Sequence, residues 1–281
     1  DLAWYLAPNA DCSFRYTDAE TFDPSAWHEK SNWDYCETNA WNMIFSAVQD
    51  VQGMINLYGG EEAALERLDA LFAADLEGQD VGMREMREVR LGQYNHTNEP
   101  SLHLAYMYAH LGQPYKTQEI VRDVLSRCYA GSSIGQGYLG DEDNGGMSGW
   151  YVFSALGFYP ASVGTGEYII GSPLFTKATI HLENGEDLVI SAPENSRDNV
   201  YIQSVQWNGE AYDKTYFTHD MLSGGGEILF EMGPAPSDWG TGADARPSSL
   251  TQGEASPAPM ADAVPAGVAT GEELDTSRGT A

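Results

Sequence analysis

The chain has 281 residues, 42% of them hydrophobic, so it is long enough to bury one large core or two ordinary ones. Its 42 acidic residues outnumber 14 basic ones and give a net charge of -28, which repels nucleic-acid backbones and anionic membrane surfaces and excludes them as partners. No apolar run reaches the roughly 18 residues of a membrane span, and the three cysteines lack metal-type spacing.

The first 165 residues are predicted to be mainly helical. Residues 1–36 are aromatic and rich in turn formers without a clear period, whereas apolar residues recur at helical spacing from Thr38 to Gly59. The segment EEAALERLDALFAA (61–74) then supplies the second helix of a helical hairpin.

A second pair of helices is predicted further along the chain. NEPSLHLAYMYAHLG (98–112) begins with Asn98 as a candidate N-cap and with Pro100 just inside the helix. YKTQEIVRDVLSRCY (115–129) follows after a short turn, so the pairing of helices repeats.

The residue pattern, and with it the predicted secondary structure, changes in the second half of the chain. MSGWYVFSALGF (147–158) is a short predicted helix that is apolar nearly all round, which predicts burial on every side. Residues 166–233 alternate between short apolar segments and turn formers and predict an antiparallel β region of about five strands. Residues 234–281 are rich in Ala, Gly, Ser, Thr and Pro, so a disordered acidic tail is predicted.

Three segments concentrate carboxylates and amides beside aromatic rings: NWDYCETNAW (32–41), YNHTNEPSLH (94–103) and GDEDNGGMSGW (140–150). Each stands where a loop enters a predicted helix, and loops between helical hairpins gather at one end of a helical barrel. A single carboxylate at a helix start is most often only a cap, because helix N-termini favour negative charge. Three such clusters beside Trp and Tyr favour a shared site.

Aromatic faces beside carboxylates suit a sugar site, because pyranose rings stack on Trp or Tyr while Asp, Asn and Glu hold the hydroxyls. Glycoside hydrolysis also needs one protonated and one ionised carboxyl group. The D-x-D-x-G pattern of Asp141, Asp143 and Gly145 is typical of calcium loops, but Val152 stands where an EF-hand requires a bidentate Glu. A calcium ion shared with other loops stays open.

Four segments in this order carry a specific resemblance: YCETNAW, NEPSLHLAYMYAHLGQPYKTQEIVRDVL, GDEDNGGMSGWYVFSALGFYP and GEYIIGSPLFTKATIHLENG. They resemble family 92 of the glycoside hydrolases, the calcium-dependent exo-acting α-mannosidases. The resemblance implies an (α/α)6 helical barrel that follows an N-terminal β-sandwich domain. It also implies release of terminal α-linked mannose from glycans, with inversion at the anomeric carbon.

By this resemblance Glu37 is the general acid, and Asp141 and Asp143 serve as the base or orient it. The physical reading agrees, because a Glu among aromatic rings keeps its proton whereas an Asp near a cation stays ionised.

The family's calcium ion binds the 2- and 3-hydroxyls of mannose, and the resemblance implies Ca2+ as the cofactor here, with Glu99 and Asp143 as candidate ligands. The candidate substrate-binding residues are Asn98, Glu99, Trp41 and His103.

Three positions depart from the family pattern. Thr38 stands where the family often has Gly, Gly146 where it often has Gln, and Asn98 where α-1,2-acting members have His. The last departure argues against α-1,2 specificity and leaves α-1,3, α-1,4, α-1,6 and other mannosidic bonds open.

The resemblance also implies that the chain is the C-terminal part of such an enzyme, with reduced or no activity alone. Its catalytic helical part is residues 1–165, followed by the β region at 166–233 and the tail at 234–281. An extracellular or periplasmic location is implied by the family. Two alternatives stay open: a non-catalytic calcium- and carbohydrate-binding module, and a glucoside-acting (α/α)6 hydrolase of the trehalase or glucoamylase kind.

Overall fold

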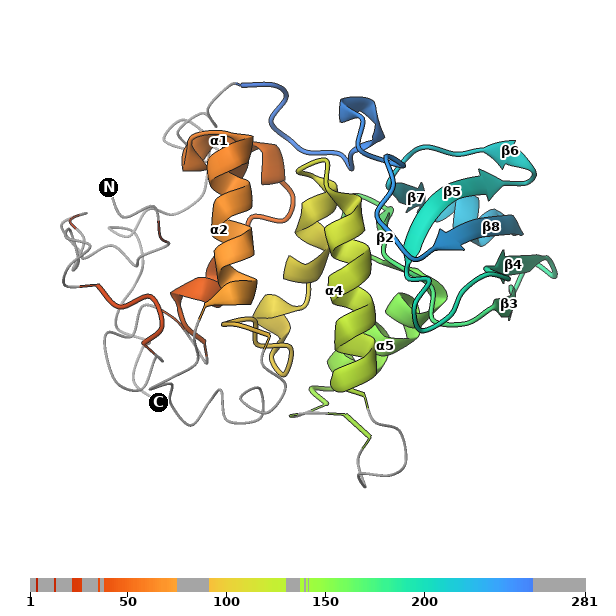
Figure 1. The fold of residues 1–281 in the computed structure, drawn as a ribbon, viewed down its shortest axis with the longest axis horizontal. Helices are drawn as coiled ribbons and strands as arrows, with labels where there is room; N and C mark the ends of the chain where they lie inside the picture. The colour runs from red at the N-terminus through yellow and green to blue at the C-terminus, as the bar shows by residue number, and fades with distance from the viewer. Residues whose placement is uncertain are drawn as a thin grey trace, which may run out of the picture.

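The computed structural model describes residues 38–74, 91–129 and 142–254, together with Trp4, Ser13, residues 22–26, Tyr35, residues 137–138 and Gly140. In Figure 1 the helices α1 and α2 lie on one side, α4 lies in the middle, and the strands lie on the other side. Within the described residues, none of the helices has the length and apolar character needed to cross a bilayer.

The helical part combines α-helices with short 3-10 helices. Its elements are η1 Ala40–Met43, α1 Val51–Tyr58, α2 Glu61–Ala73, η3 Glu99–Ser101, η4 Leu104–Ala109, α4 Pro114–Arg127 and α5 Gly146–Leu156. Asp50 caps the N-terminus of helix α1, because its carboxylate accepts the Gly53 N–H. Gly59 caps the C-terminus with φ 100, a left-handed conformation that suits glycine. Helices α2, α4 and α5 confirm the corresponding predictions.

The continuous helix predicted from Thr38 to Gly59 is wrong, because residues 44–50 interrupt it. Ile44 is extended, and Phe45 has φ 57, a left-handed conformation that is uncommon for a bulky residue. The Phe45 ring is fully buried and packs edge-to-face with the Tyr58 ring, with the two ring centroids 5.3 Å apart. This tertiary contact outweighs the helical periodicity of the local sequence.

The predicted helix at residues 98–112 is a pair of 3-10 helices, η3 and η4. Pro100 lies in the first turn as predicted, but the Asn98 side chain makes no capping hydrogen bond. All six residues of η4 are buried, so packing rather than helical propensity shapes this segment.

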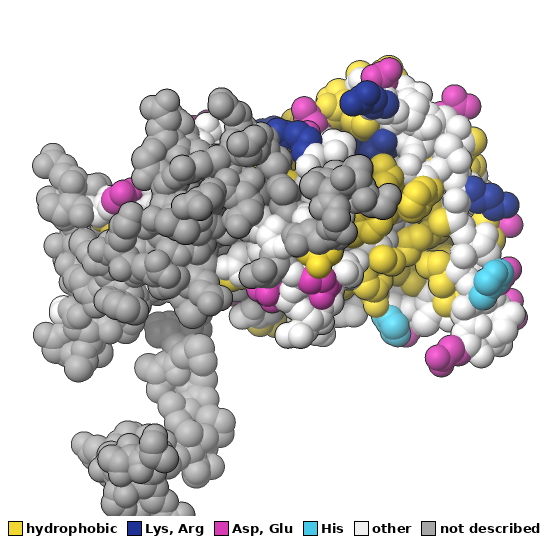
Figure 2. All heavy atoms as spheres, turned by 90° about the horizontal axis from the view of Figure 1, so that it is seen from below, with side chains coloured by type: hydrophobic (Ala, Val, Ile, Leu, Met, Phe, Trp, Pro, Cys, Tyr) yellow, Lys and Arg dark blue, Asp and Glu magenta, His cyan; other side chains and the backbone are white. Residues whose placement is uncertain are grey.

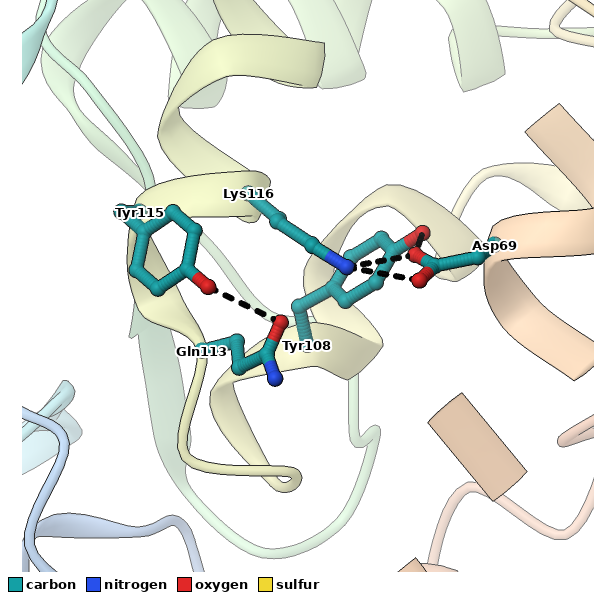
Figure 3. Close-up of polar contacts among 5 residues, drawn as sticks. All are labelled: Asp69, Tyr108, Gln113, Tyr115 and Lys116. Carbon is teal, nitrogen blue, oxygen red and sulfur yellow. Dashed lines mark hydrogen bonds and ion pairs between the residues drawn. The ribbon is translucent and has the colours of Figure 1, made fainter. Parts of the chain in front are cut away.

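An ion pair joins three elements of the helical part (Figure 3). The Lys116 ammonium of α4 lies 2.7 and 2.8 Å from the two carboxylate oxygens of Asp69 on α2, and the Tyr108 hydroxyl of η4 donates to the same carboxylate at 2.8 Å. The pair fixes α2 against η4 and α4.

The β region contains two sheets. Strands β1 Phe158–Tyr159, β2 Glu167–Ile170 and β7 Tyr216–Thr218 form the smaller one, in the order β1-β2-β7. The larger one has the order β3-β4-β8-β5-β6, with β3 Lys177–His181, β4 Asp187–Ser191, β5 Tyr201–Trp207, β6 Glu210–Ala211 and β8 Gly226–Gly233. The short helix α6 His219–Gly224 precedes β8.

The prediction of a purely antiparallel region is wrong in one pairing. Strands β4 and β8 run parallel, whereas β3 with β4 and β5 with β8 run antiparallel. A parallel pair needs a long crossover, and residues 192–225 supply it.

Arg122 of α4 joins the helical part to the β region. Its guanidinium donates to the Asn195 side-chain oxygen at 2.6 Å, to the Pro173 carbonyl at 2.8 Å and to the Ser196 carbonyl at 2.8 Å. Burial lowers the pKa of Arg122 from its ordinary value.

Residues 234–254 are ordered, which corrects the prediction of a disordered tail from 234 onward. Trp239 is buried and donates its indole N–H to the Tyr212 carbonyl at 2.9 Å. Further on, Arg246 pairs with Glu61 of α2, and Thr251 donates to the Asp50 carboxylate. Figure 1 shows this stretch crossing from the strands to α1. Residues 255–281 lie outside the described residues.

Helix α5 is not buried on every side, contrary to its prediction from composition. Trp150 is fully buried, but Val152 is 54% exposed. In the view of Figure 2, hydrophobic side chains gather on one face of the described part, and the exposed large hydrophobic residues include Val152 and Phe175.

Candidate active site

Two of the predicted catalytic residues, Glu37 and Asp141, lie outside the described residues. The structure describes Asp143 and all four predicted substrate-binding residues, Trp41, Asn98, Glu99 and His103. It also describes the residues that directly follow Glu37 and those on both sides of Asp141.

The segment after Glu37 is joined to the loop that carries Asn98 and Glu99. Asn42 donates to the Gln93 carbonyl at 3.0 Å and accepts from the Asn95 N–H at 2.9 Å and the Ser101 hydroxyl at 2.9 Å. Asn39 donates to the Gln93 side-chain oxygen at 3.0 Å. Two of the three polar segments of the sequence are therefore neighbours.

The acidic loop packs against the loop that carries Asn98 and Glu99. A Cβ atom at Gly140 would lie 2.4 Å from the Thr97 Cβ, so this close approach requires glycine, and Gly140 has φ 71. A Cβ at Gly146 would lie 3.5 Å from the Glu99 Cγ and 3.8 Å from the Asp143 Cβ. Glu99 and Asp143 therefore flank Gly146, and their carboxylates come from facing segments.

Glu142 caps helix α5. Its carboxylate accepts the Gly145 N–H at 2.6 Å and the Ser148 N–H at 3.1 Å. Hydrogen bonds from Ser148 and Gly145 lower the pKa of Glu142 below its ordinary value of 4.5. Of the acidic triplet, the middle residue has the structural role that a carboxylate at a helix start usually has.

The backbone of the acidic loop is in an uncommon conformation. Asp143 and Asn144 both have φ 54, and Gly145 has φ 104. Left-handed conformations at residues other than glycine are uncommon, although Asp and Asn tolerate them best, and they concentrate at functional sites. This turn carries Asp143 to the start of α5, beside Glu99.

A layer of aromatic rings contacts the segments of the site. His96 is fully buried, with its ring nitrogens 2.8 Å from the Tyr94 hydroxyl and 2.8 Å from the Tyr129 hydroxyl. Burial lowers its pKa to about 3, so the ring is neutral. Tyr129 also donates to the Met147 carbonyl at 3.1 Å, which links this layer to the start of α5.

The contacts of His103 and Trp41 are to other parts of the chain than the acidic loop. The His103 Nε2 lies 3.1 Å from the Phe45 carbonyl oxygen, and burial, the larger influence, lowers its pKa to about 4. The Trp41 indole N–H donates to the Ser25 hydroxyl at 3.0 Å. The Trp41 and Trp4 rings both line a hollow of about 330 Å³. They pack edge-to-face, with their ring centroids 4.9 Å apart.

Within the described residues, the side chains around Gly146 provide only some of the oxygen ligands that a hard cation such as calcium needs. No group of three or more His, Cys, Asp or Glu side chains in that part of the chain lies close enough to hold a metal ion. The two carboxylates that flank Gly146 are oxygen donors of the type that calcium prefers.

Two polar residues of the site, Asn42 and Gln93, lie just outside the polar segments of the sequence and were not singled out, because polar residues inside or before a predicted helix give no signal of their own. Asn95 and Ser101 lie within the segment 94–103, but the pattern gives them no individual role. Only the folded structure, which buries all four, identifies them as a network.

The chain matches the family model "Glycosyl hydrolase family 92 catalytic domain" over residues 7–234. A curated relative from Arthroderma benhamiae, an uncharacterized secreted glycosidase, is 27% identical over 220 residues, which cover 77% of this chain and 26% of that protein.

Two solved structures from Bacteroides thetaiotaomicron are also similar. The family GH92 α-mannosidase BT3965 in complex with mannoimidazole is 31% identical with a TM-score of 0.82, over 90% of this chain and 33% of that one. The family GH92 inverting mannosidase BT2199 is 38% identical with a TM-score of 0.72, over 87% of this chain and 33% of that one. The chain thus spans about a third of the length of these mannosidases.

Proposed function

This chain belongs to glycosyl hydrolase family 92, and from that premise we propose that it carries the active site of an exo-acting α-mannosidase. The proposed substrate is terminal α-linked mannose in glycans or mannosides. The observation that supports it most is the position of the loop 95–101. It contacts segment 39–42 through Asn95 and Ser101, and it contacts the acidic loop at Gly140 and Gly146.

The proposed reaction is a single displacement with general acid and base. Glu37 donates its proton to the glycosidic oxygen as the bond from that oxygen to the anomeric carbon breaks. A water molecule attacks the anomeric carbon from the opposite face and loses a proton. In the pair Asp141 and Asp143, one carboxylate accepts this proton as the base or the pair orients the base. The product mannose has the inverted configuration.

The proposed cofactor is Ca2+, with Glu99 and Asp143 as ligands. When bound, the ion would hold the 2- and 3-hydroxyls of mannose and favour distortion of its ring. The proposed sugar contacts are Asn98, Glu99, Trp41 and His103. The side chain of Asn98, in place of a histidine, favours a linkage other than α-1,2.

The remaining assignments follow from the relatives. We assign the paired helices to part of an (α/α)6 barrel and the site of action to the outside of the cytoplasm, in agreement with the secreted relative. Because the chain spans about a third of the solved mannosidases, an N-terminal β-sandwich domain is a proposed partner, and activity of the chain alone is proposed to be reduced or absent.

The experiment is mannose release from an aryl α-mannoside and from α-linked mannobioses, with calcium and with excess chelator. The expected result is slow release that needs calcium and that falls by roughly 10²- to 10⁴-fold on mannobioses in Glu37→Gln. Equal rates in Glu37→Gln and in the parent chain would contradict the assignment. Binding of mannoimidazole without release of mannose would instead indicate the non-catalytic binding module.

A further inference from the structure

The Asn42 side chain is the centre of a buried amide network. Its NH2 group donates to the Asn39 side-chain oxygen at 2.8 Å and to the Gln93 carbonyl at 3.0 Å. Its oxygen accepts from the Asn95 N–H at 2.9 Å and the Ser101 hydroxyl at 2.9 Å. Four hydrogen bonds use both donors and both acceptor sites of the amide, so its orientation is unique.

The network is shielded from water. Asn39, Asn42, Gln93 and Ser101 are each 0% exposed, and Asn95 is 1% exposed. Hydrogen bonds in such surroundings are strong, and a group left without its partner retains the full desolvation cost. Removing the Asn42 amide would therefore break four hydrogen bonds to buried partners at once.

The position of the network in the chain gives it a functional meaning. Asn39 and Asn42 follow Glu37 closely in sequence, whereas Asn95 and Ser101 bracket Asn98 and Glu99. The same loop meets the acidic segment through Thr97 and Gly140. Asn42 thus connects the segment of the proposed acid to the loop of the proposed metal ligand.

We propose that Asn42 is a positioning residue that sets the spacing between the Glu37 segment and the loop that carries Asn98 and Glu99. The inference rests on the proposed function. An inverting hydrolase needs its two carboxyl groups about 6.5–9.5 Å apart, because a water molecule must fit beside the sugar. A shift of about 1 Å in such a constellation can lower the rate about 10²-fold.

Asn195 offers a matched control. It is a buried asparagine whose amide is also bonded at both ends, accepting from Arg122 at 2.6 Å and donating to the Leu174 carbonyl at 2.9 Å. It lies at the joint between α4 and the β region and contacts none of the site segments through these bonds. Asn195→Ala therefore reproduces the loss of a buried amide away from the site.

The first test is hydrogen exchange of the parent chain, Asn42→Ala and Asn195→Ala. Asn42→Ala is expected to raise exchange at least about 10-fold in both 38–43 and 93–101, because one side chain holds the two segments together. Asn195→Ala is expected to raise exchange around residues 172–176 only. Unchanged exchange of residues 38–43 in Asn42→Ala would overturn the inference.

The second test separates a positioning role from a purely structural one by leaving group. A misplaced acid matters most for a poor leaving group, so Asn42→Ala should lose roughly 10²-fold on methyl α-mannoside and less than about 10-fold on 2,4-dinitrophenyl α-mannoside. Equal losses on both substrates would overturn the inference. Ser101→Ala, which removes one of the four bonds, should show the same split to a smaller extent and serves if Asn42→Ala does not fold.

A failure of the proposed function is distinguishable from a failure of the inference. A parent chain that neither hydrolyses a mannoside nor binds mannoimidazole contradicts the proposed function, and hydrogen exchange then decides whether Asn42 couples the two segments. A parent chain that is active, with equal losses in Asn42→Ala and Asn195→Ala, contradicts the inference alone.

Discussion

The helical part and the β region differ in where they keep their polar side chains. In the helical part, residues 38–42 and 93–118 supply most of the buried polar side chains of the described chain. In the β region the polar side chains of the strands mostly face outward, as those of β3 do at both of its ends. Because a buried polar group must be hydrogen-bonded, the helical part is held by specific contacts where the β region relies on apolar packing.

The histidines show the same difference. His96 is 0% exposed and His110 is 4% exposed, and burial lowers the pKa of each to about 3. In the β region, His181 and His219 are exposed. The segment that carries the proposed sugar and metal contacts is therefore also the segment with neutral, buried imidazoles.

The largest expected effect is a loss of stability of the helical part in mild acid. The unfolded chain takes up a proton at each histidine below a pKa of about 6.5, whereas folded His96 and His110 do so only near 3 and folded His103 only near 4. Stability is therefore complete above pH 6.5 and falls as the pH drops, by roughly 1.4 kcal/mol per pH unit for each histidine. Urea unfolding followed between pH 7.5 and 5 measures this slope.

His110→Leu is the control for that slope. Within the described residues the His110 Nε2 is buried without a hydrogen-bond partner, so the substitution breaks no bond there. It should flatten the pH dependence by roughly 1.4 kcal/mol per unit. Hydrogen exchange at pH 5 should open residues 93–118 before the strands, and opening of the strands first would refute the comparison.

The next effect concerns the joint between the two regions. Arg122→Ala removes donors from three acceptors in 173–196 and should lower the free energy of unfolding by about 2–3 kcal/mol. Arg127→Ala on the same helix removes an exposed ion pair with Asp123 and should cost less than about 1 kcal/mol. Chemical denaturation measures both, and equal losses would show that the joint is not specific.

The smallest effect compares one glycine from each region. Gly140 has φ 71 and packs on Thr97, whereas Gly164 has φ 97 and faces open space. Alanine at residue 164 should cost about 1–2 kcal/mol through backbone strain alone. At residue 140 the clash adds to the strain and shifts the acidic loop, so calcium-dependent mannose release should fall as well. Retained release in Gly140→Ala would show that this contact does not place the loop.

Part of the fold could be predicted from the sequence because its signals are local. The periodicity of α2 and α4 and the alternation of the strands match the structure. The break at Phe45 and the parallel pairing of β4 with β8 could not be predicted, because both depend on contacts distant in sequence. The order of residues 234–254 has the same origin, in partners such as Asp50 and Glu61.

The candidate site divides in a similar way. Composition and motifs select the three polar segments, and the structure joins residues 39–42 to 95–101 and 95–101 to Gly140 and Gly146. Composition does not separate Glu142, which caps α5, from Asp143, which faces Glu99's segment at Gly146. The roles of Glu37 and Asp141 stay predictions, since both residues lie outside the described part.

The most direct measurement compares one aspartate from each region in mannose release from methyl α-mannoside with calcium present. Asp143→Asn removes the carboxylate beside Gly146, and Asp187→Asn removes the exposed carboxylate that pairs with His181. The account predicts a loss of roughly 10²-fold or more in Asp143→Asn and an unchanged rate in Asp187→Asn. Equal rates in the two variants would contradict the placement of the active site at the acidic loop.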